Sequence, residues 1–113
     1  MADLDARAML RKLARSPDLL PFRELVEPLA HYDREQASFL IRTLRAYFAS
    51  GESASEAAER LFLHRNSVPY RLNRISELTG LDWRDPQARL ALKLGLMAMD
   101  EERENRGEDK HAQ

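Results

Sequence analysis

The segment 53–72 constrains the fold of this chain more than any other, and it reads Ser-Ala-Ser-Glu-Ala-Ala-Glu-Arg-Leu-Phe-Leu-His-Arg-Asn-Ser-Val-Pro-Tyr-Arg-Leu. Ser53 and Glu56 have the spacing of a capping box, which predicts a short helix with small alanines facing inward. A tight turn around 62–64 leads to a second helix, expected over 65–79, with Arg, Asn, Ser and Tyr exposed. Two short helices joined in this way are typical of a helix-turn-helix, whose second helix enters the major groove of DNA.

Pro69 departs from this pattern because it lies inside the second helix. If that helix begins at Arg65, Pro69 is its fifth residue, so it loses the bond to the Arg65 carbonyl and clashes with it, which costs about 3 kcal/mol. Two alternatives avoid this: the helix begins later, with Ser67 as N-cap and Pro69 in the first turn, or the first turn is distorted. Either alternative changes where Arg65 and Asn66 point.

The rest of the sequence predicts further helices, so we expect an all-α fold, a small helical domain of about six helices containing the helix-turn-helix. Valine and isoleucine are sparse and no alternating pattern persists, which argues against a sheet. Further helices are expected at 4–15, at 21–30 with Pro28 bending or ending it, from a capping box of Asp33 and Gln36 to a stop at Ser50 and Gly51, and at 86–102 after Asp85. We expect an N-terminal helix and connector at 1–18, a helix-turn-helix domain at 19–103 with its core at 53–80, and a disordered polar tail at 104–113.

The charges are unevenly distributed, although the formal net charge is only −1. The segment 60–76 holds four arginines and no acidic residue, whereas 100–113 holds six acidic and three basic residues. A local basic patch allows contact with phosphates, and the near-neutral total argues against a protein that coats nucleic acid non-specifically. Both segments are equally compatible with ordinary solvated faces.

Composition excludes several classes of protein. The chain has no cysteine, which rules out disulfides and thiolate metal sites and is compatible with a reducing cytoplasm. No apolar run approaches the roughly 20 residues of a membrane-spanning helix, and the N-terminus lacks the pattern of a secretory signal. Clustered histidines, a glycine-rich phosphate loop and paired carboxylates in an apolar setting are also missing. We therefore expect a cytoplasmic protein that is not an enzyme, uses no cofactor or metal and has no membrane partner.

Several blocks of the sequence together resemble one family. They are 44–48, 53–58, 63–68, 70–75, 77–82 and 89–92, with 25–33 upstream, so that the similarity covers roughly 19–99. They resemble the C-terminal helix-turn-helix of purine-catabolism and sugar-diacid regulators of the PucR and CdaR type, and the His-Arg-Asn-Ser-Val block at 64–68 is the most specific part. The resemblance implies a DNA-binding transcription regulator, whose relatives usually carry a sensory or ligand-binding region before this domain. We expect either a standalone module or a fragment of a longer protein.

The candidate DNA-binding residues lie on the two helices of the helix-turn-helix. Arginine forks to guanine and asparagine pairs with adenine, while serine, tyrosine and backbone amides at a helix start bind phosphate. In the family Pro69 is usually replaced by a basic or other helix-compatible residue, so we expect DNA recognition that is weaker than or different from the family's. The candidate residues are Ser53, Ser55, His64, Arg65, Asn66, Ser67, Tyr70, Arg71 and Arg74.

Most of these residues also have a purely structural interpretation. His64 can be a cap or a packing residue, and Asn66 and Ser67 can simply cap the second helix. Tyr70 can be half in the core. Arg74 can pair with Glu77, three residues further along the same helix.

The expected last helix, 86–102, has two apolar stripes. Leu90, Leu94 and Met97 form one stripe, and Leu92, Leu96 and Met99 form the other. A helix that is apolar on two sides is covered on both, either by the N-terminal helices or by a second subunit, so we expect a homodimer through this helix. The function expected is DNA-binding transcription regulation with double-stranded DNA as partner. The alternative is a dimerisation or protein-interaction module that kept the fold but binds DNA weakly because of Pro69.

Overall fold

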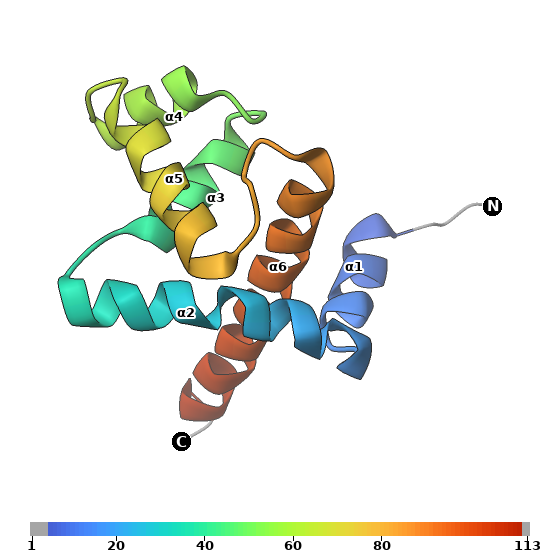
Figure 1. Cartoon of the computed structure of the whole chain (residues 1–113). Helices are drawn as coiled ribbons and strands as arrows, with labels where there is room; N and C mark the ends of the chain where they lie inside the picture. Colours follow the sequence, from blue (N-terminus) through green and yellow to red (C-terminus); the bar gives the residue numbers. More distant parts are fainter. Residues whose placement is uncertain (1–4, 112–113) are drawn as a thin grey trace. The chain divides into compact units, whose positions relative to one another are not determined.

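The structure is a computed structural model that describes the backbone of residues 5–111 and the side chains of residues 5–106. Every regular element in these residues is helical, which confirms the all-α prediction (Figure 1). The elements are α1 (Ala6–Ala14), the 3-10 helix η1 (Pro17–Leu19), α2 (Leu20–Gln36), α3 (Leu40–Ala49), α4 (Ala54–Leu61), α5 (Ser67–Thr79) and α6 (Pro86–His111). Backbone contacts divide the chain into two units, which we call the terminal unit (1–26 with 90–113) and the central unit (27–89).

In the terminal unit, α1 begins after Asp5, whose side chain accepts the N–H of Ala8 at 3.2 Å. The expected start of this helix at Leu4 lies outside the described residues. Ser16 then caps η1 by accepting the N–H of Asp18 at 3.1 Å, so the Ser-Pro-Asp segment ends α1 as expected. Three large apolar side chains of α1 are exposed: Met9, Leu10 and Leu13.

Gly95 allows α2 and α6 to approach closely inside the terminal unit. A Cβ at Gly95 would lie only 2.4 Å from the carbonyl oxygen of Phe22 and 2.8 Å from Cγ1 of Val26. Any larger side chain would therefore push the two helices apart. The apolar stripe of α6 that shares a helix face with Gly95 is buried. It consists of Leu92, Leu96 and Met99.

Ion pairs join α6 to the N-terminal part of the terminal unit. Arg15 Nε is 2.6 Å from Oε1 of Glu101, and Arg23 Nε is 2.9 Å from Oε2 of Glu102. The hydrogen bond from Arg23, together with the charges of Arg23 and Arg106, lowers the pKa of Glu102 below its ordinary value. Both carboxylates belong to the acidic segment 100–113, which the sequence analysis described as compatible with an ordinary solvated face. In the structure both are paired with arginines.

The central unit contains the helix-turn-helix. Its helices α3, α4 and α5 contact one another in all three pairs (Figure 1). The alanines of α4 face inward as predicted, because Ala57 and Ala58 are almost fully buried. The core of these three helices comprises Leu40, Leu44, Tyr47, Ala57, Ala58, Val68, Leu72 and Ile75.

The prediction for 21–30 underestimated α2, which continues through Pro28 to Gln36. A proline inside a helix removes one hydrogen bond and costs about 3 kcal/mol. Val26 and Leu29, on either side of Pro28, are both fully buried, and each contributes roughly 1.5–3 kcal/mol through burial. Burial therefore outweighs the local penalty, and Pro28 itself faces solvent.

The capping box of Asp33 and Gln36 was also wrong, because both residues belong to α2. Asp33 nevertheless caps α3 from a distance. Its carboxylate accepts the N–H of Leu40 at 2.8 Å and the N–H of Ile41 at 3.0 Å, seven and eight residues further on. The hydroxyl of Ser38 donates to the same carboxylate. A tertiary contact thus takes the place of the local cap.

Other predicted boundaries agree with the structure. Gly51 follows α3 with φ +66°, the left-handed conformation expected after a helix. Asp85 precedes α6 and accepts the N–H of Gln87 at 3.3 Å. The end expected near Glu102 was wrong, since α6 continues to His111 through much of the predicted polar tail. The last two residues of that tail lie outside the described part, and the proposed domain boundaries stay predictions.

Candidate nucleic-acid interface

Pro69 is the third residue of α5, because the helix begins at Ser67 and not at Arg65. The first backbone bond that spans four residues here joins the N–H of Tyr70 to the carbonyl of Asn66, at 3.3 Å. Amides of the first helical turn have no partner inside the helix, so the missing N–H of Pro69 breaks no bond. The later start avoids the proline penalty, with Asn66 rather than Ser67 as the flanking residue.

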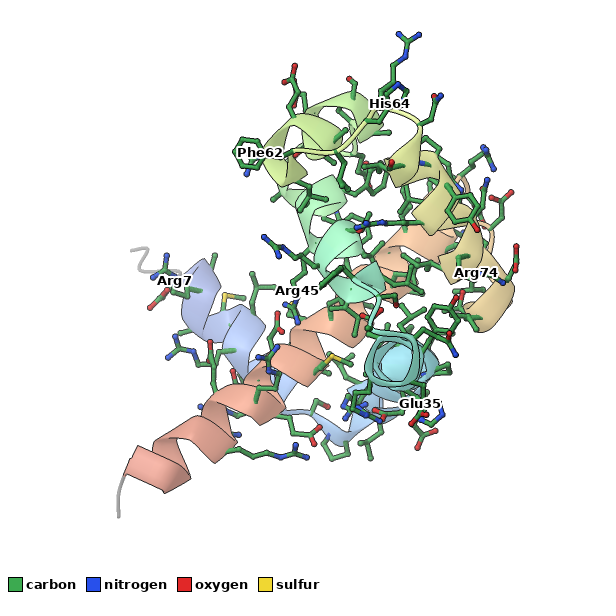
Figure 2. All side chains as sticks on the ribbon, turned by 90° about the vertical axis from the view of Figure 1, so that its left-hand side faces the viewer. Arg7, Glu35, Arg45, Phe62, His64 and Arg74 are labelled. Atoms are coloured by element: carbon green, nitrogen blue, oxygen red, sulfur yellow. The ribbon has the colours of Figure 1, made fainter. Side chains whose placement is uncertain are left out.

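The turn before α5 is built around Phe62. This residue has φ +57° and ψ +43°, and the N–H of the following Leu63 bonds to the carbonyl of Ala58 at 2.9 Å. A non-glycine residue in the left-handed region is strained. Phe62 is also 95% exposed, and its ring projects on the opposite side of the unit from Arg74 (Figure 2). The ring therefore lies away from the α5 face that carries the candidate contacts.

His64 acts as a local cap. Its Nδ1 accepts the backbone N–H of Asn66 at 3.1 Å, and its carbonyl accepts the N–H of Ser67 at 2.9 Å. These bonds hold the segment that leads into α5, with His64 at the free end of the turn (Figure 2). The imidazole remains exposed, as do Arg65 and Asn66. The structural role predicted for His64 is thus present beside an accessible side chain.

The solvent face of α5 is a narrow polar strip. Asn66, Tyr70, Asn73 and Glu77 are all exposed and follow one another at intervals of three or four residues. Tyr70 is 69% exposed, so the half-core interpretation of this residue was wrong. The opposite face carries the buried Val68, Leu72 and Ile75.

Arg71 lies at the edge of this strip and reaches into the protein. Its Nη1 donates to Oγ1 of the buried Thr43 on α3 at 3.0 Å. Thr43 in turn donates its hydroxyl to the carbonyl of Phe39 at 2.8 Å. Arg71 is thus a structural link between α5 and α3, in addition to its expected role as a phosphate contact.

Arg74 makes the pair predicted for it, with Nη1 2.8 Å from Oε2 of Glu77. Its guanidinium carbon also lies 5.8 Å from the ring centroid of Tyr32 on α2. The charge of Glu77, followed by Tyr32 and a hydrogen bond with Tyr70, raises the pKa of Arg74 above its ordinary value. Arg74 therefore remains charged and partly exposed at one side of α5.

The two serines at the start of α4 differ in their roles. Ser53 Oγ accepts the N–H of Glu56 at 3.2 Å, which confirms the predicted cap. Ser55 is exposed, with its hydroxyl 3.3 Å from that of Ser53. Ser53 is occupied by the helix start, whereas Ser55 faces solvent.

The reasoning from sequence missed three residues of this region as candidates: Asn73 on α5, and Trp83 and Arg84 in the connector that follows it. Trp83 Nε1 donates to Oδ1 of Asn73 at 2.8 Å, and the guanidinium of Arg84 lies 4.5 Å from the centroid of the Trp83 ring. The helical interval from Tyr70 was a signal for Asn73. Nothing in the sequence indicated that the 80–85 connector returns to the solvent face of α5.

The described residues hold no group of three or more His, Cys, Asp or Glu side chains arranged for a metal ion. Across the same part of the chain, no helix is both long and apolar enough to cross a membrane. The arrangement that remains is a capped α4, a strained turn and an unbroken α5 with a polar face. This geometry defines a helix-turn-helix domain.

Comparison with known families agrees with this class. The model of the PucR C-terminal helix-turn-helix domain matches residues 40–98. The chain belongs to this family, as the motifs in its sequence predicted. No solved structure gives a significant match.

Three curated bacterial regulators are similar to this chain. It is 46% identical over 81 residues to the carbohydrate diacid regulator of Escherichia coli K12, covering 71% of this chain and 21% of the relative. It is 38% identical over 85 residues to the purine catabolism regulatory protein of Bacillus subtilis, covering 69% of this chain and 16% of the relative. It is 39% identical over 67 residues to the proline-responsive transcriptional activator PutR of the same organism, covering 59% of this chain and 16% of the relative. The chain thus spans about a fifth or less of the length of these relatives.

Proposed function

We propose that this chain is a DNA-binding transcriptional regulator, or the C-terminal DNA-binding module of one, and that it reads the major groove with α5. The observation that carries the proposal is the position of Pro69 in the first turn of α5. An unbroken helix with a polar face is the element that a helix-turn-helix presents to base edges.

This position of Pro69 also bears on the alternative, a helical interaction module with weak DNA binding. That alternative rested on damage to the second helix, and a proline in a first turn causes little damage. What Pro69 does remove is a cation that the resemblance leads us to expect here. We infer a loss of at most one phosphate contact, with groove recognition retained.

We assign different roles to the candidate residues. We assign contacts with base edges to Arg65 and Asn66, which are exposed just before α5 begins. Tyr70 lies one turn further along the same face. Phosphate contacts fit the exposed Ser55 and the charged Arg74. The remaining candidates, which also have structural bonds, are assigned to the border of the interface: Ser53, His64, Ser67 and Arg71.

Regulators named for carbohydrate diacids, for proline and for purine catabolism all share this segment. That favours a role common to all three over recognition of any one metabolite. We accordingly propose a binding module with no catalytic activity and no cofactor. Its expected place of action is the bacterial cytoplasm, where the DNA lies.

We further propose that the chain forms a homodimer through α6. Leu90 is 57% exposed, and Leu94 and Met97, on the same stripe, are only partly buried. An apolar stripe of this kind suits a two-fold interface, and two-fold dimers match paired half-sites in DNA.

The proposed function is tested by measuring how tightly the purified chain binds labelled duplex DNA. Fluorescence anisotropy of the label gives the affinity at several salt concentrations. Several phosphate contacts predict a steep fall in affinity as salt rises. Selection of bound fragments from genomic DNA then gives the preferred sequence. Absence of binding to any duplex at low salt, for both the wild type and Pro69→Arg, would refute the proposal.

A further inference from the structure

The connector between α5 and α6 is held tightly against α5. The backbone N–H of Trp83 donates to Oγ of Ser76 at 2.9 Å, and the N–H of Leu81 donates to Oγ1 of Thr79 at 3.3 Å. These bonds fix both ends of a short segment to the C-terminal half of α5. The connector is therefore a rigid extension of that helix.

Trp83 is the centre of this connector. Its ring meets the buried ring of Tyr47 on α3 edge to face, with centroids 5.7 Å apart, while its indole N–H bonds to Asn73. A tryptophan held by a ring contact and by its N–H has a defined orientation. The ring face is the part on which Arg84 lies.

Stacking leaves Arg84 able to bind a ligand. The guanidinium lies 4.5 Å from the Trp83 centroid, yet its side chain is 62% exposed. Cation–π stacking uses the flat face of a guanidinium, whereas its N–H donors point outward in the plane. The stack thus holds an arginine in one orientation, in which Nη1 reaches Asn73 at 3.5 Å and the other N–H donors of the guanidinium plane point outward, as binding of a phosphate requires.

The location of this arginine is beside the polar strip of α5. Asn73, which bonds Trp83, belongs to that strip, and Nη1 of Arg84 lies 3.5 Å from Oδ1 of Asn73. On the other side of α5, Arg74 lies over Tyr32. The helix face is therefore bordered on each side by an arginine that lies over an aromatic ring, and phosphate backbones likewise flank a groove on both sides.

We propose that the α5–α6 connector is a second DNA contact, in which Arg84 binds a backbone phosphate and Trp83 acts as its positioning residue. This inference rests on the proposed function, since it requires α5 to face duplex DNA. Phosphate contacts carry no sequence information, so the connector contributes affinity and register and leaves base choice to α5.

Acidic side chains near Arg84 reduce its attraction for DNA. Asp82 Oδ1 lies 3.9 Å from Nη1 of Arg84 and also accepts the backbone N–H of Arg84 at 3.0 Å. Asp85 caps the start of α6 close by. The separation of 3.9 Å is too long for a hydrogen bond, so Asp82 weakens the local positive field without occupying the donors of Arg84.

The test uses the full chain and a fluorescein-labelled, mixed-sequence DNA duplex of about three helical turns. Anisotropy gives the affinity across a range of salt concentrations for the wild type, Arg84→Gln and the matched control Arg103→Gln, an exposed arginine on α6. Arg84→Gln is expected to weaken binding about tenfold at low salt and to reduce the salt slope by about one. The control is expected to keep both values.

Two further measurements separate a DNA contact from a merely structural role. Asp82→Asn keeps the acceptor for the Arg84 amide but removes the charge, so it is expected to raise affinity, which no purely structural role predicts. Trp83 is the only tryptophan of the chain, so its emission is expected to change when unlabelled duplex is added. Trp83→Phe keeps a ring but loses the N–H bond to Asn73. Its affinity for DNA is expected to lie between those of the wild type and Arg84→Gln.

The outcomes distinguish this inference from the function on which it rests. Normal DNA binding by Arg84→Gln, with an unchanged salt slope and no change in Trp83 emission, overturns the connector contact and leaves the regulator proposal standing. A wild-type chain that binds no duplex at low salt overturns both.

Discussion

The guanidinium of Arg71 on α5 donates to Oγ1 of Thr43 on α3 at 3.0 Å, and Thr43 is fully buried. Removal of one partner leaves the other with an unmet polar group inside the central unit. We therefore expect Thr43→Val, which keeps the volume of the side chain, to lower the free energy of unfolding by about 1–3 kcal/mol. Urea denaturation followed by circular dichroism measures this change. A double-mutant cycle with Arg71→Met is expected to show coupling above about 0.5 kcal/mol, and strictly additive effects would contradict the link.

Asp33 is predicted to be the most sensitive carboxylate of the central unit. Asp33→Ala removes the acceptor for the amides of Leu40 and Ile41, and the expected loss is about 2 kcal/mol in the free energy of unfolding. Glu35→Ala, an exposed change on the same helix, serves as the control and is expected to stay within about 0.5 kcal/mol. Equal effects of the two changes in urea denaturation would show that Asp33 is no cap.

Proline is expected to be tolerated at the start of α5 but not further along it. Pro69→Ala should change the free energy of unfolding by less than about 1 kcal/mol, because no helical hydrogen bond is regained at this position. Glu77→Pro, in the second half of the same helix, should cost about 3 kcal/mol or more. Thermal unfolding of both variants gives the comparison, and a large gain in stability for Pro69→Ala would indicate strain at Pro69.

The pH dependence of stability should reveal Glu102. Its pKa is lowered in the folded chain, chiefly by the hydrogen bond from Arg23, so the unfolded state binds the proton more readily. The stabilisation is fully present above the unfolded value, near 4.5, and is lost as the pH falls through the lower folded value. Because the side chain is 38% exposed, the effect is modest. Glu102→Gln should flatten this acid limb in urea titrations at several pH values, whereas the exposed Glu104→Gln should leave it unchanged.

The proposed dimer depends on the exposed stripe of α6. Leu90→Lys should shift the chain to monomer in sedimentation experiments while circular dichroism stays unchanged, because Leu90 is 57% exposed in the single chain. Gln87→Lys adds the same charge one turn earlier and should leave the oligomeric state unaltered. A wild-type chain that sediments only as monomer at high concentration would exclude the dimer.

Local signals in the sequence predicted the parts of this fold that depend on neighbouring residues. The cap at Ser53, the left-handed Gly51 and the buried face of α5 are each determined by residues within about one helical turn. Two of the features that were missed depend on distant contacts. Asp33 serves a helix that begins seven residues later, and Trp83 returns to Asn73 across ten positions.

The candidate interface shows the same division. Periodicity located the strip that contains Asn66 and Tyr70, since one face of a helix follows from spacing alone. Periodicity could not indicate that Arg71 turns inward to Thr43, because the direction of the Arg71 side chain depends on α3, a helix far from it in the sequence. The sequence likewise left open whether α5 begins at Arg65 or later. In the structure the hydrogen bonds of the turn around His64 determine the later start.

Pro69 also has a consequence for the entropy of binding. A proline ring restricts the unfolded chain and fixes one backbone angle of the first α5 turn in a helical value. That turn is thus ordered before any DNA arrives, and less conformational freedom remains to be lost when the complex forms. Compared with Pro69→Arg, the wild type exchanges one ionic contact for a recognition helix that is already in its bound shape.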